Sequence, residues 1–363
     1  MNLRVCLKRI SERFAAWMEE RLGLEAARDF LRYKTVPQNR HTMWSYTGSL
    51  ILLFFSIQAV TGIILAFYYR PTLEEANKSV ARIMTEVPLG WVIRSVHFWS
   101  ATFMIAAVFV HLLSIWIIKS YRKPRELTWM SGVLLLVFTL AFGFTGYLLP
   151  WDDLSLAATK VGTDIPRSIP VVGAWVTKFL RGGEDISGDT LTRFFSFHVT
   201  ILPLLLLALV AFHVYLIQKL GMSLPVGADE QREARRAIPF WPNFVYREMI
   251  VWLILFGVLV SVAVFWPPSL AKPADLMAPA PEGIKPEWYF LFLFQTLKIF
   301  PAKILFISGD TVAVSLILLG ALLFFFLPLI DNKPAERKGK IITLMAFVFI
   351  LYAVVMSLWS LLG

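Results

Sequence analysis

Two histidines set in a strongly apolar stretch are the residues of this 363-residue chain best suited to chemistry. The stretch RSVHFWSATFMIAAVFVHLL, residues 94–113, contains His97 and His111, which are 14 residues apart. On an α-helix this spacing places both rings within about 40° on one face and about 21 Å apart along the axis. Because the hydrocarbon core of a membrane is about 30 Å thick, one ring would lie in each half of it.

A second apolar stretch repeats the pattern. In FHVTILPLLLLALVAFHV, residues 197–214, His198 and His213 are 15 residues apart, with Pro203 between them. On an uninterrupted helix they would lie about 60° apart, although a proline can bend a helix. Ionisable groups inside a membrane are rare and usually functional. We therefore interpret the two pairs as ligands rather than as isolated hydrogen-bonded core histidines.

The pairing of the histidines by membrane depth indicates what they bind. If both helices cross in the same direction, His97 and His198 lie near the outer face, and His111 and His213 near the inner face. A small metal ion would usually need more ligands than two imidazoles, whereas haem iron takes two axial ligands. The chain contains no Cys-x-x-Cys-His motif for covalent haem attachment. Two non-covalent b-type haems, each between two histidines, fit best.

Glycines in the flanking apolar stretches have the same spacing. Gly48 and Gly62 are 14 residues apart, as are Gly132 and Gly146. Glycine allows another group close to the backbone, so we expect porphyrin edges against Gly62 and Gly146 at the outer level and against Gly48 and Gly132 at the inner level. Ordinary close packing of membrane helices is the alternative. Arg94, one turn before His97, is placed to pair with a haem propionate or to snorkel to the surface.

Composition identifies the elements that must position these residues. Apolar residues make up 57% of the chain and charged residues 17%, against about 25% charged in soluble domains. Seven stretches reach the roughly 20 residues that span a bilayer. They are residues 45–69, 92–118, 129–150, 194–217, 247–267, 311–330 and 341–362. We predict an all-α membrane protein in which four helices form a haem-binding bundle and three further transmembrane helices follow.

The N-terminal residues 1–44 differ from the rest. They lack the apolar region of a signal peptide, and RFAAWMEERLGLEAARDFL reads as an amphipathic helix on the membrane surface. With this end cytoplasmic, the inner loops hold 22 Lys and Arg residues and the outer loops 12. This bias predicts a cytoplasmic N-terminus and an outer C-terminus. It also explains the net charge of +10 without a nucleic-acid partner.

Several motifs resemble cytochrome b of the quinol-oxidising Rieske/cytochrome b complexes. They are YYRPTLEEANKSVARIMTEVPLGWVIRSVHFWSA, RKPRELTWMSGV, GFTGYLLPWDD and LTRFFSFHVTILPLLLL. The likeness is strongest to the b6 protein of the cytochrome b6f complex, and PEWYFLFLFQTLKIFPAKILF resembles its partner, subunit IV. The resemblance implies an amphipathic segment over 1–44, a b6-like di-haem bundle over 45–220 and a subunit IV-like three-helix region over 221–363.

The resemblance also implies a role for each histidine. His97 and His198 would ligate a low-potential haem near the outer face, and His111 and His213 a high-potential haem near the inner face.

An outer quinol site is implied in the same way. Pro286, Glu287, Trp288 and Tyr289 match the PEWY motif of that site, and Tyr147 would line the same pocket. Glu287 would take a proton from quinol, since a carboxylate in a partly apolar pocket is a competent base. From the residues alone, PEWY reads as a loop leading into a helix, with Pro286 starting it and Glu287 stabilising its first turn.

The chain departs from the b6 pattern at two places. Ser45 stands where that branch has a cysteine that tethers an extra haem covalently, and Cys6, the sole cysteine, is far away in the sequence. Gln218 stands where the branch has an arginine after the last haem histidine. Ser45 and Lys219 are the candidates left for an inner quinone site.

Together with these residues, the resemblance implies the quinone-binding subunit of a proton-translocating quinol:cytochrome c, or plastocyanin-type, oxidoreductase in a bacterial inner membrane. Electrons would pass to a Rieske protein and, through the two haems, to an inner quinone. A c-type cytochrome and a second copy of the complex are the other expected partners. A di-haem anchor linking quinone to another oxidoreductase module is the alternative, although it has no need of PEWY. A haem-free transporter would not require the regular histidine and glycine spacing.

Overall fold

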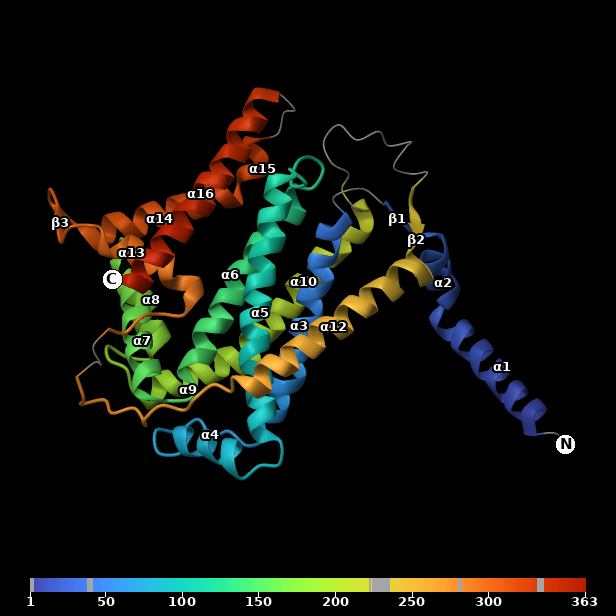
Figure 1. Ribbon diagram of the computed structural model, residues 1–363, viewed down its shortest axis with the longest axis horizontal. Helices are drawn as coiled ribbons and strands as arrows, with labels where there is room; N and C mark the ends of the chain where they lie inside the picture. The colour runs from blue at the N-terminus through green and yellow to red at the C-terminus, as the bar shows by residue number, and fades with distance from the viewer. Residues whose placement is uncertain (1–2, 38–41, 222, 224–235, 280–282, 332–335) are drawn as a thin grey trace. The chain divides into compact units, whose positions relative to one another are not determined.

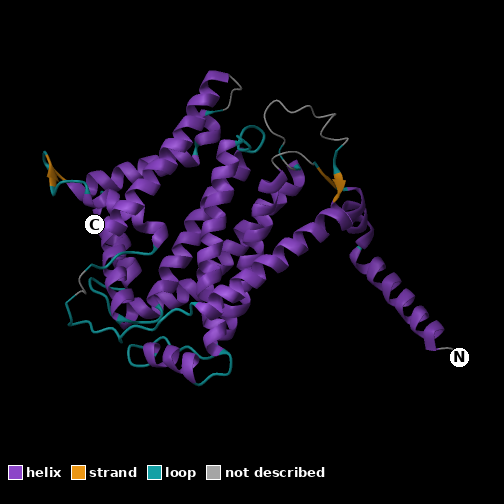
Figure 2. Ribbon diagram, in the orientation of Figure 1, coloured by secondary structure: helices purple, strands orange, loops and turns teal. Residues whose placement is uncertain are grey.

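The structure is a computed structural model that describes residues 3–37, 42–221, 223, 236–279, 283–331 and 336–363. Its contacts divide the chain into two compact units. One comprises Met1–Tyr46 and Leu224–Phe256, and the other Thr47–Ser223 and Gly257–Gly363. These units cut across the sequence segments 1–44, 45–220 and 221–363, so that division remains a prediction. Helices dominate the described residues, among which strands form only two short pairs (Figures 1 and 2).

The first unit begins with two helices, α1 (Leu3–Leu22) and α2 (Leu24–Tyr33). The sequence predicted a single helix here, but Gly23 between them has φ +56°, which ends α1 because the left-handed region is not helical. After α2, β1 (Thr35–Val36) pairs antiparallel with β2 (Ile238–Pro239). A π-helical turn, η3 (Phe240–Phe244), then leads into α12 (Val245–Phe265).

Six helical segments of the described chain are long and apolar enough to cross a membrane, which confirms an integral membrane protein of helical class. They lie in α3 (Thr42–Ala66), α5 (Gly90–Ile117), α6 (Glu126–Leu148), the run from α9 (Gly188–Ser196) to α10 (Leu202–Leu220), η3 with α12, and α16 (Glu336–Leu362).

The remaining predicted span, 311–330, is broken. It consists of α14 (Gly309–Phe325), of 17 residues, and α15 (Leu327–Ile330), which are separated at Phe326. Pro328 lies at the start of α15. Proline is tolerated in the first turn of a helix but not in its interior, because it has no N–H to donate. The apolar stretch therefore divides into two helices instead of forming one.

The fourth membrane-crossing helix contains a π-helical turn, η2 (Phe197–Ile201), between α9 and α10. Here Leu202 N–H donates to the carbonyl of Phe197, five residues back. A π-turn takes up one additional residue. This turn lets His198 and His213 both face α6 despite their 15-residue spacing. α6 packs against both α5 and α10, and Figure 1 shows the three helices side by side.

Shorter helices join the spans of the second unit on the side where α6 ends. α4 (Ala76–Thr85) precedes α5, while α7 (Asp153–Asp164), η1 (Ile165–Ser168) and α8 (Gly173–Arg181) follow α6. Asp152 caps α7 in a reciprocal capping box with Ser155. The chain after α12 returns to this point, because Ala274 N–H donates to Trp151 O and Asp153 N–H to Lys272 O.

A buried ion pair joins the loop after α5 to the end of α15. The Asp331 carboxylate accepts hydrogen bonds from Arg122 Nε at 3.0 Å, Arg122 Nη2 at 2.9 Å and the Tyr121 hydroxyl at 2.6 Å. The Asp331 side chain is 1% exposed. A carboxylate so buried needs all these partners, because its desolvation is costly. A shared apolar cluster surrounds this point and includes Leu112, Trp116, Trp129, Leu327 and Ala346.

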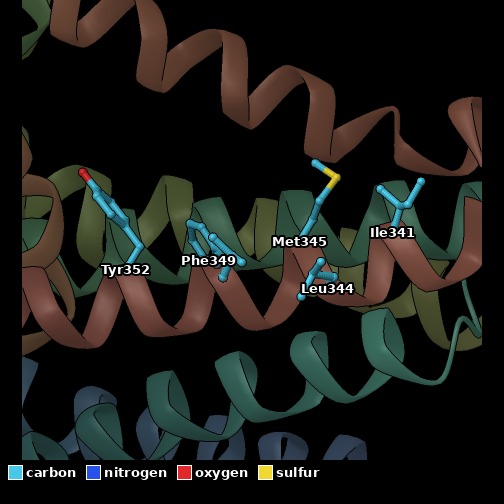
Figure 3. A pocket seen from close by; sticks show the side chains of 6 residues that line it. Ile341, Leu344, Met345, Phe349 and Tyr352 are labelled. Atoms are coloured by element: carbon cyan, nitrogen blue, oxygen red, sulfur yellow. The ribbon is translucent and has the colours of Figure 1, made fainter.

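The helices after the PEWY motif also pack together. η4 (Trp288–Phe290) leads into α13 (Leu291–Lys298), which lies against α16. The hairpin of β3 (Lys303–Ile304) and β4 (Ile307–Ser308) connects α13 to α14. An apolar groove runs along α16 (Figure 3), where Tyr352 bonds Thr296 Oγ1 at 2.6 Å. Its lining residues, none of them a predicted site residue, are Ile341, Leu344, Met345, Val348, Phe349 and Tyr352.

Candidate haem and quinol sites

Each of the four predicted histidines is hydrogen-bonded through Nδ1 to a hydroxyl on a neighbouring helix. The α5 histidines bond to α3 and the α10-side histidines to α6. The four Oγ–Nδ1 distances are 2.9 Å for Thr61–His97, 2.8 Å for Thr47–His111, 3.2 Å for Thr145–His198 and 2.8 Å for Ser131–His213. Residues far apart in the sequence thus hold the rings at four equivalent places.

The direction of these hydrogen bonds follows from where the hydroxyl hydrogens go. Thr61 donates to Ile57 O at 2.6 Å, Thr145 to Ala141 O at 2.9 Å and Ser131 to Thr128 O at 2.9 Å. Since a hydroxyl has one hydrogen, each oxygen then accepts from the histidine Nδ1–H. A neutral ring protonated at Nδ1 has its lone pair at Nε2, the form that ligates a metal.

The predicted glycines lie against the same rings. A Cβ placed on each glycine would lie 2.6 Å from His198 Cε1 at Gly146, 3.2 Å from His97 at Gly62, 3.3 Å from His213 at Gly132 and 3.6 Å from His111 at Gly48. Gly62 and Gly146 therefore lie against the two histidines of the outer pair, and Gly48 and Gly132 against those of the inner pair. Their contact with porphyrin edges remains a prediction.

Alanine substitutions at these glycines should have graded effects. We expect Gly146→Ala to displace His198 and to weaken or remove the outer haem, because 2.6 Å is too short for a real Cβ contact. Gly48→Ala is the matched control, since its Cβ would meet His111 at an ordinary 3.6 Å. Haem content and reduced-minus-oxidised spectra of both variants measure the difference. Equal spectra for the two variants would contradict the steric argument.

The facing rings have a separation that fits a six-coordinate iron. The ring centres of His97 and His198 are 6.3 Å apart, with planes inclined at 74°. Two metal–nitrogen bonds of about 2 Å, with about 1.1 Å from each nitrogen to its ring centre, give about 6 Å. His111 and His213 lie within electrostatic range of each other. Nowhere in the described residues do three or more His, Cys, Asp or Glu side chains gather to hold a metal ion.

Arg94 is engaged by the loop that follows α12. Its Nη1 donates to Pro268 O at 2.8 Å and its Nη2 to Ser269 O at 3.3 Å, and Asp152 interacts with it electrostatically. Arg94 thus anchors this loop to the start of α5. Its pairing with a haem propionate remains a prediction.

The PEWY motif begins a helix two residues later than the sequence suggested. Trp288 is the first residue of η4, and Glu287 is its N-cap, so Pro286 does not start the helix. The Glu287 side chain makes no capping hydrogen bond, and only its carbonyl does so, with Phe290 N–H at 2.8 Å. Helix capping therefore does not account for the carboxylate. Burial raises the pKa of Glu287 above its ordinary value.

The other predicted residues of the outer site gather around Glu287. Its charge acts on both Tyr147 and Tyr289. The Tyr289 hydroxyl lies against Gly143, where a Cβ added to the glycine would be 2.6 Å from the hydroxyl oxygen. The ring centres of Trp288 and Phe109 are 6.3 Å apart. Segments from α5, α6 and the PEWY loop thus meet at one place.

Lys219 and Ser45 are the candidate residues for an inner quinone site. Lys219 lies in the last turn of α10, whereas the side chain of Ser45 lies outside the described residues. The inner quinone site therefore remains a prediction. The sequence reading missed the hydroxyls of Thr47, Thr61, Ser131 and Thr145, although each directly precedes a glycine of the 14-residue pattern.

Two family models and several known proteins are similar to this chain. The family model described as cytochrome b/b6/petB matches residues 31–221, and that described as cytochrome b(C-terminal)/b6/petD matches residues 273–363. A cytochrome bc complex cytochrome b subunit of Chlorobaculum thiosulfatiphilum is 44% identical over 325 residues, which cover 89% of this chain and 75% of the relative. Cytochrome b6 of Gracilaria tenuistipitata var. liui is 43% identical over 210 residues, or 58% of this chain and 97% of the relative.

A solved structure is also similar. A chain of a hyperthermophilic respiratory Complex III superposes with a TM-score of 0.84 at 29% identity. The match covers 95% of this chain and 90% of the other.

Proposed function

Because this chain belongs to the cytochrome b/b6 family, as the cytochrome b subunit of a bc-type quinol oxidoreductase complex, we propose that it holds two non-covalent b haems and an outer quinol site. His97 and His198 would bind the outer, low-potential haem through Nε2, and His111 and His213 the inner, high-potential one. The haem iron, when bound, supplies a one-electron carrier at each depth. The chain's own part is to hold two neutral imidazoles per iron.

The observation that carries this proposal is the common geometry of the four histidines. Each Nδ1 is bound to a hydroxyl, and the outer rings face each other at 6.3 Å. A proton relay or a simple packing role would not require all four rings to be held through Nδ1 by a hydroxyl. Two pairs at two depths do match two axially ligated irons.

At the outer site, the Glu287 carboxylate would accept a proton from the quinol hydroxyl. Its burial disfavours the charged form, which makes it a stronger base than an exposed carboxylate. Trp288, Tyr289 and Tyr147 would form walls around the quinol ring, and Pro286 would fix the approach of the loop. Asp152 is less suited to this role, because its carboxylate already accepts from Ser155 N–H at 2.8 Å.

Other subunits must supply the remaining redox centres. The chain has one cysteine, which cannot ligate an iron–sulfur cluster by itself. We propose a Rieske protein and a c-type cytochrome as partners, in a homodimeric complex of the respiratory chain. The similarity to a chain of a respiratory Complex III supports this assembly. The distribution of Lys and Arg favours a cytoplasmic N-terminus in a bacterial inner membrane.

Haem counting and turnover together test the proposal. Pyridine haemochrome analysis of the purified complex should give two b haems per copy of this chain, and quinol should reduce a c-type acceptor. One haem or none would refute the two-site arrangement. Two haems without quinol:cytochrome c turnover would instead favour a di-haem anchor for another oxidoreductase module.

We predict that neither haem is attached covalently. Ser45 occupies the place at which the b6 branch has its tethering cysteine, and a hydroxyl forms no thioether. After denaturing electrophoresis, haem staining should leave this chain unstained, while a c-type cytochrome in the same lane provides the positive control. A stained band at the 41.4 kDa of this chain would contradict the prediction.

A further inference from the structure

We infer that the hydroxyls of Thr47, Thr61, Ser131 and Thr145 are positioning groups that fix the tautomer of the four histidines and set how strongly each ring donates to iron. This inference rests on the proposed ligation of haem by Nε2. It adds four residues that act through the ligands without touching the iron.

For three of the four hydroxyls, the evidence for a fixed tautomer is that the hydroxyl hydrogen is already used, and we extend the inference to Thr47 from its equivalent position at His111. Thr61, Thr145 and Ser131 donate to carbonyls of their own helices, so only an acceptor remains for the ring. In the apolar interior of a membrane, a ring N–H without an acceptor is costly. The Nδ1–H form is therefore favoured over the alternative, in which the proton would occupy Nε2 and block the iron.

Chance contact is the competing explanation, because Ser and Thr in helices often bond back to a carbonyl one turn earlier. The chain contains hydroxyls that do only this. Thr139 in α6 donates to Leu135 O at 2.8 Å and Ser56 in α3 to Leu52 O at 2.8 Å, and within the described residues neither is hydrogen-bonded to a histidine. By contrast, the four positioning hydroxyls each directly precede a glycine that contacts the same ring.

The pairing of hydroxyl and glycine has a physical reason. The glycine lets the imidazole edge approach the helix backbone, as the 3.2 Å from a Cβ on Gly62 to His97 Cε1 indicates. The hydroxyl one residue earlier then meets Nδ1 at 2.9 Å. One residue makes room for the ring and the other fixes its orientation.

The consequence for the iron follows from electron donation. An acceptor on Nδ1–H increases the basicity of the ring and thus favours the oxidised iron over the reduced one. Removing the hydroxyl should raise the midpoint potential of the affected haem, and by less at His213, whose ring also has a backbone hydrogen bond with Thr128. The effect should be confined to the haem whose ligand has lost its partner, since Thr61 and Ser131 serve different levels.

Redox titration of the purified complex, followed in the α-band of each haem, tests the inference. We expect Thr61→Val to raise the potential of the outer haem alone and Ser131→Ala that of the inner haem alone. Thr61→Ser and Ser131→Thr keep the hydroxyl and should retain the wild-type potentials. Thr139→Val removes a buried hydroxyl of α6, the helix that also carries Ser131. This variant is the matched control, and the potentials of both haems should stay unchanged in it. The affected haem should also dissociate about tenfold faster.

The outcomes separate this inference from the proposed function. Two haems at unchanged potentials in both Thr61→Val and Ser131→Ala would overturn the positioning role and leave the ligation intact. An equal shift in Thr139→Val would also overturn it, since that hydroxyl serves no ligand. A wild-type complex without two b haems would refute the proposed function itself. Loss of one haem in Thr61→Val, with its retention in Thr61→Ser, supports the inference in its strongest form.

Discussion

Replacing Glu287 with glutamine is expected to lower quinol oxidation by about 10²-fold, the usual scale for losing a general base. Glutamine keeps the size of the side chain but cannot accept the quinol proton. The carboxylate makes no capping hydrogen bond, so the fold should not depend on it. Both haems should keep their spectra, because their ligands lie on other helices. Stopped-flow or steady-state turnover of the purified complex measures the effect.

The pH dependence gives this prediction a second readout. A protonated Glu287 cannot accept a proton, so turnover should rise with pH as the carboxyl ionises. Burial raises its pKa, so this rise should lie above the ordinary value of about 4.3 for glutamate. The Glu287→Gln enzyme should lack this limb of the profile.

Two neighbouring aspartates provide controls for the Glu287 variant. Asparagine caps a helix about as well as aspartate, so Asp152→Asn should keep the capping box with Ser155 and near-normal turnover. Asp153→Asn should behave likewise. Full turnover and an unaltered pH profile in Glu287→Gln would remove that residue from the mechanism and direct attention to the aspartates.

Loss of a single histidine should remove one haem and leave the other. His97→Ala or His198→Ala should abolish the outer haem, whereas His111→Ala or His213→Ala should abolish the inner one. The reason is that each ring has its own hydroxyl and its own glycine on a neighbouring helix. Haem per chain should fall from two to one, and low-temperature spectra identify which band is lost. Loss of both haems from every single variant would contradict two independent sites.

The sequence predicted the class of fold and the helices because apolar length and histidine spacing are visible in one dimension. It could not locate the break at Phe326, since Pro328 is compatible with either a helix start or a kink. Nor could it predict that Gly23 separates α1 from α2, because a glycine within an amphipathic pattern is often tolerated.

The histidines stood out from the sequence, whereas their hydroxyl partners did not. Ionisable rings are rare in apolar stretches, but Ser and Thr are common in membrane helices. The position of Thr61 before Gly62, repeated at the three other glycines, was the available signal. The roles of Glu287 and Arg94 depend on loops that fold back from distant segments. Contacts such as Arg94 with Pro268 have no counterpart in local sequence patterns.

The π-turn η2 has a consequence for how related chains are recognised. Inserting one residue into a regular helix rotates every later side chain by about 100°, which would move His213 off the face shared with His198. A π-turn confines that rotation to a single turn, so both histidines still face α6. The 15-residue spacing on a helix with one π-turn therefore serves the same geometry as a 14-residue spacing on a regular helix. A search that fixes this spacing would separate chains whose ligand geometry is the same.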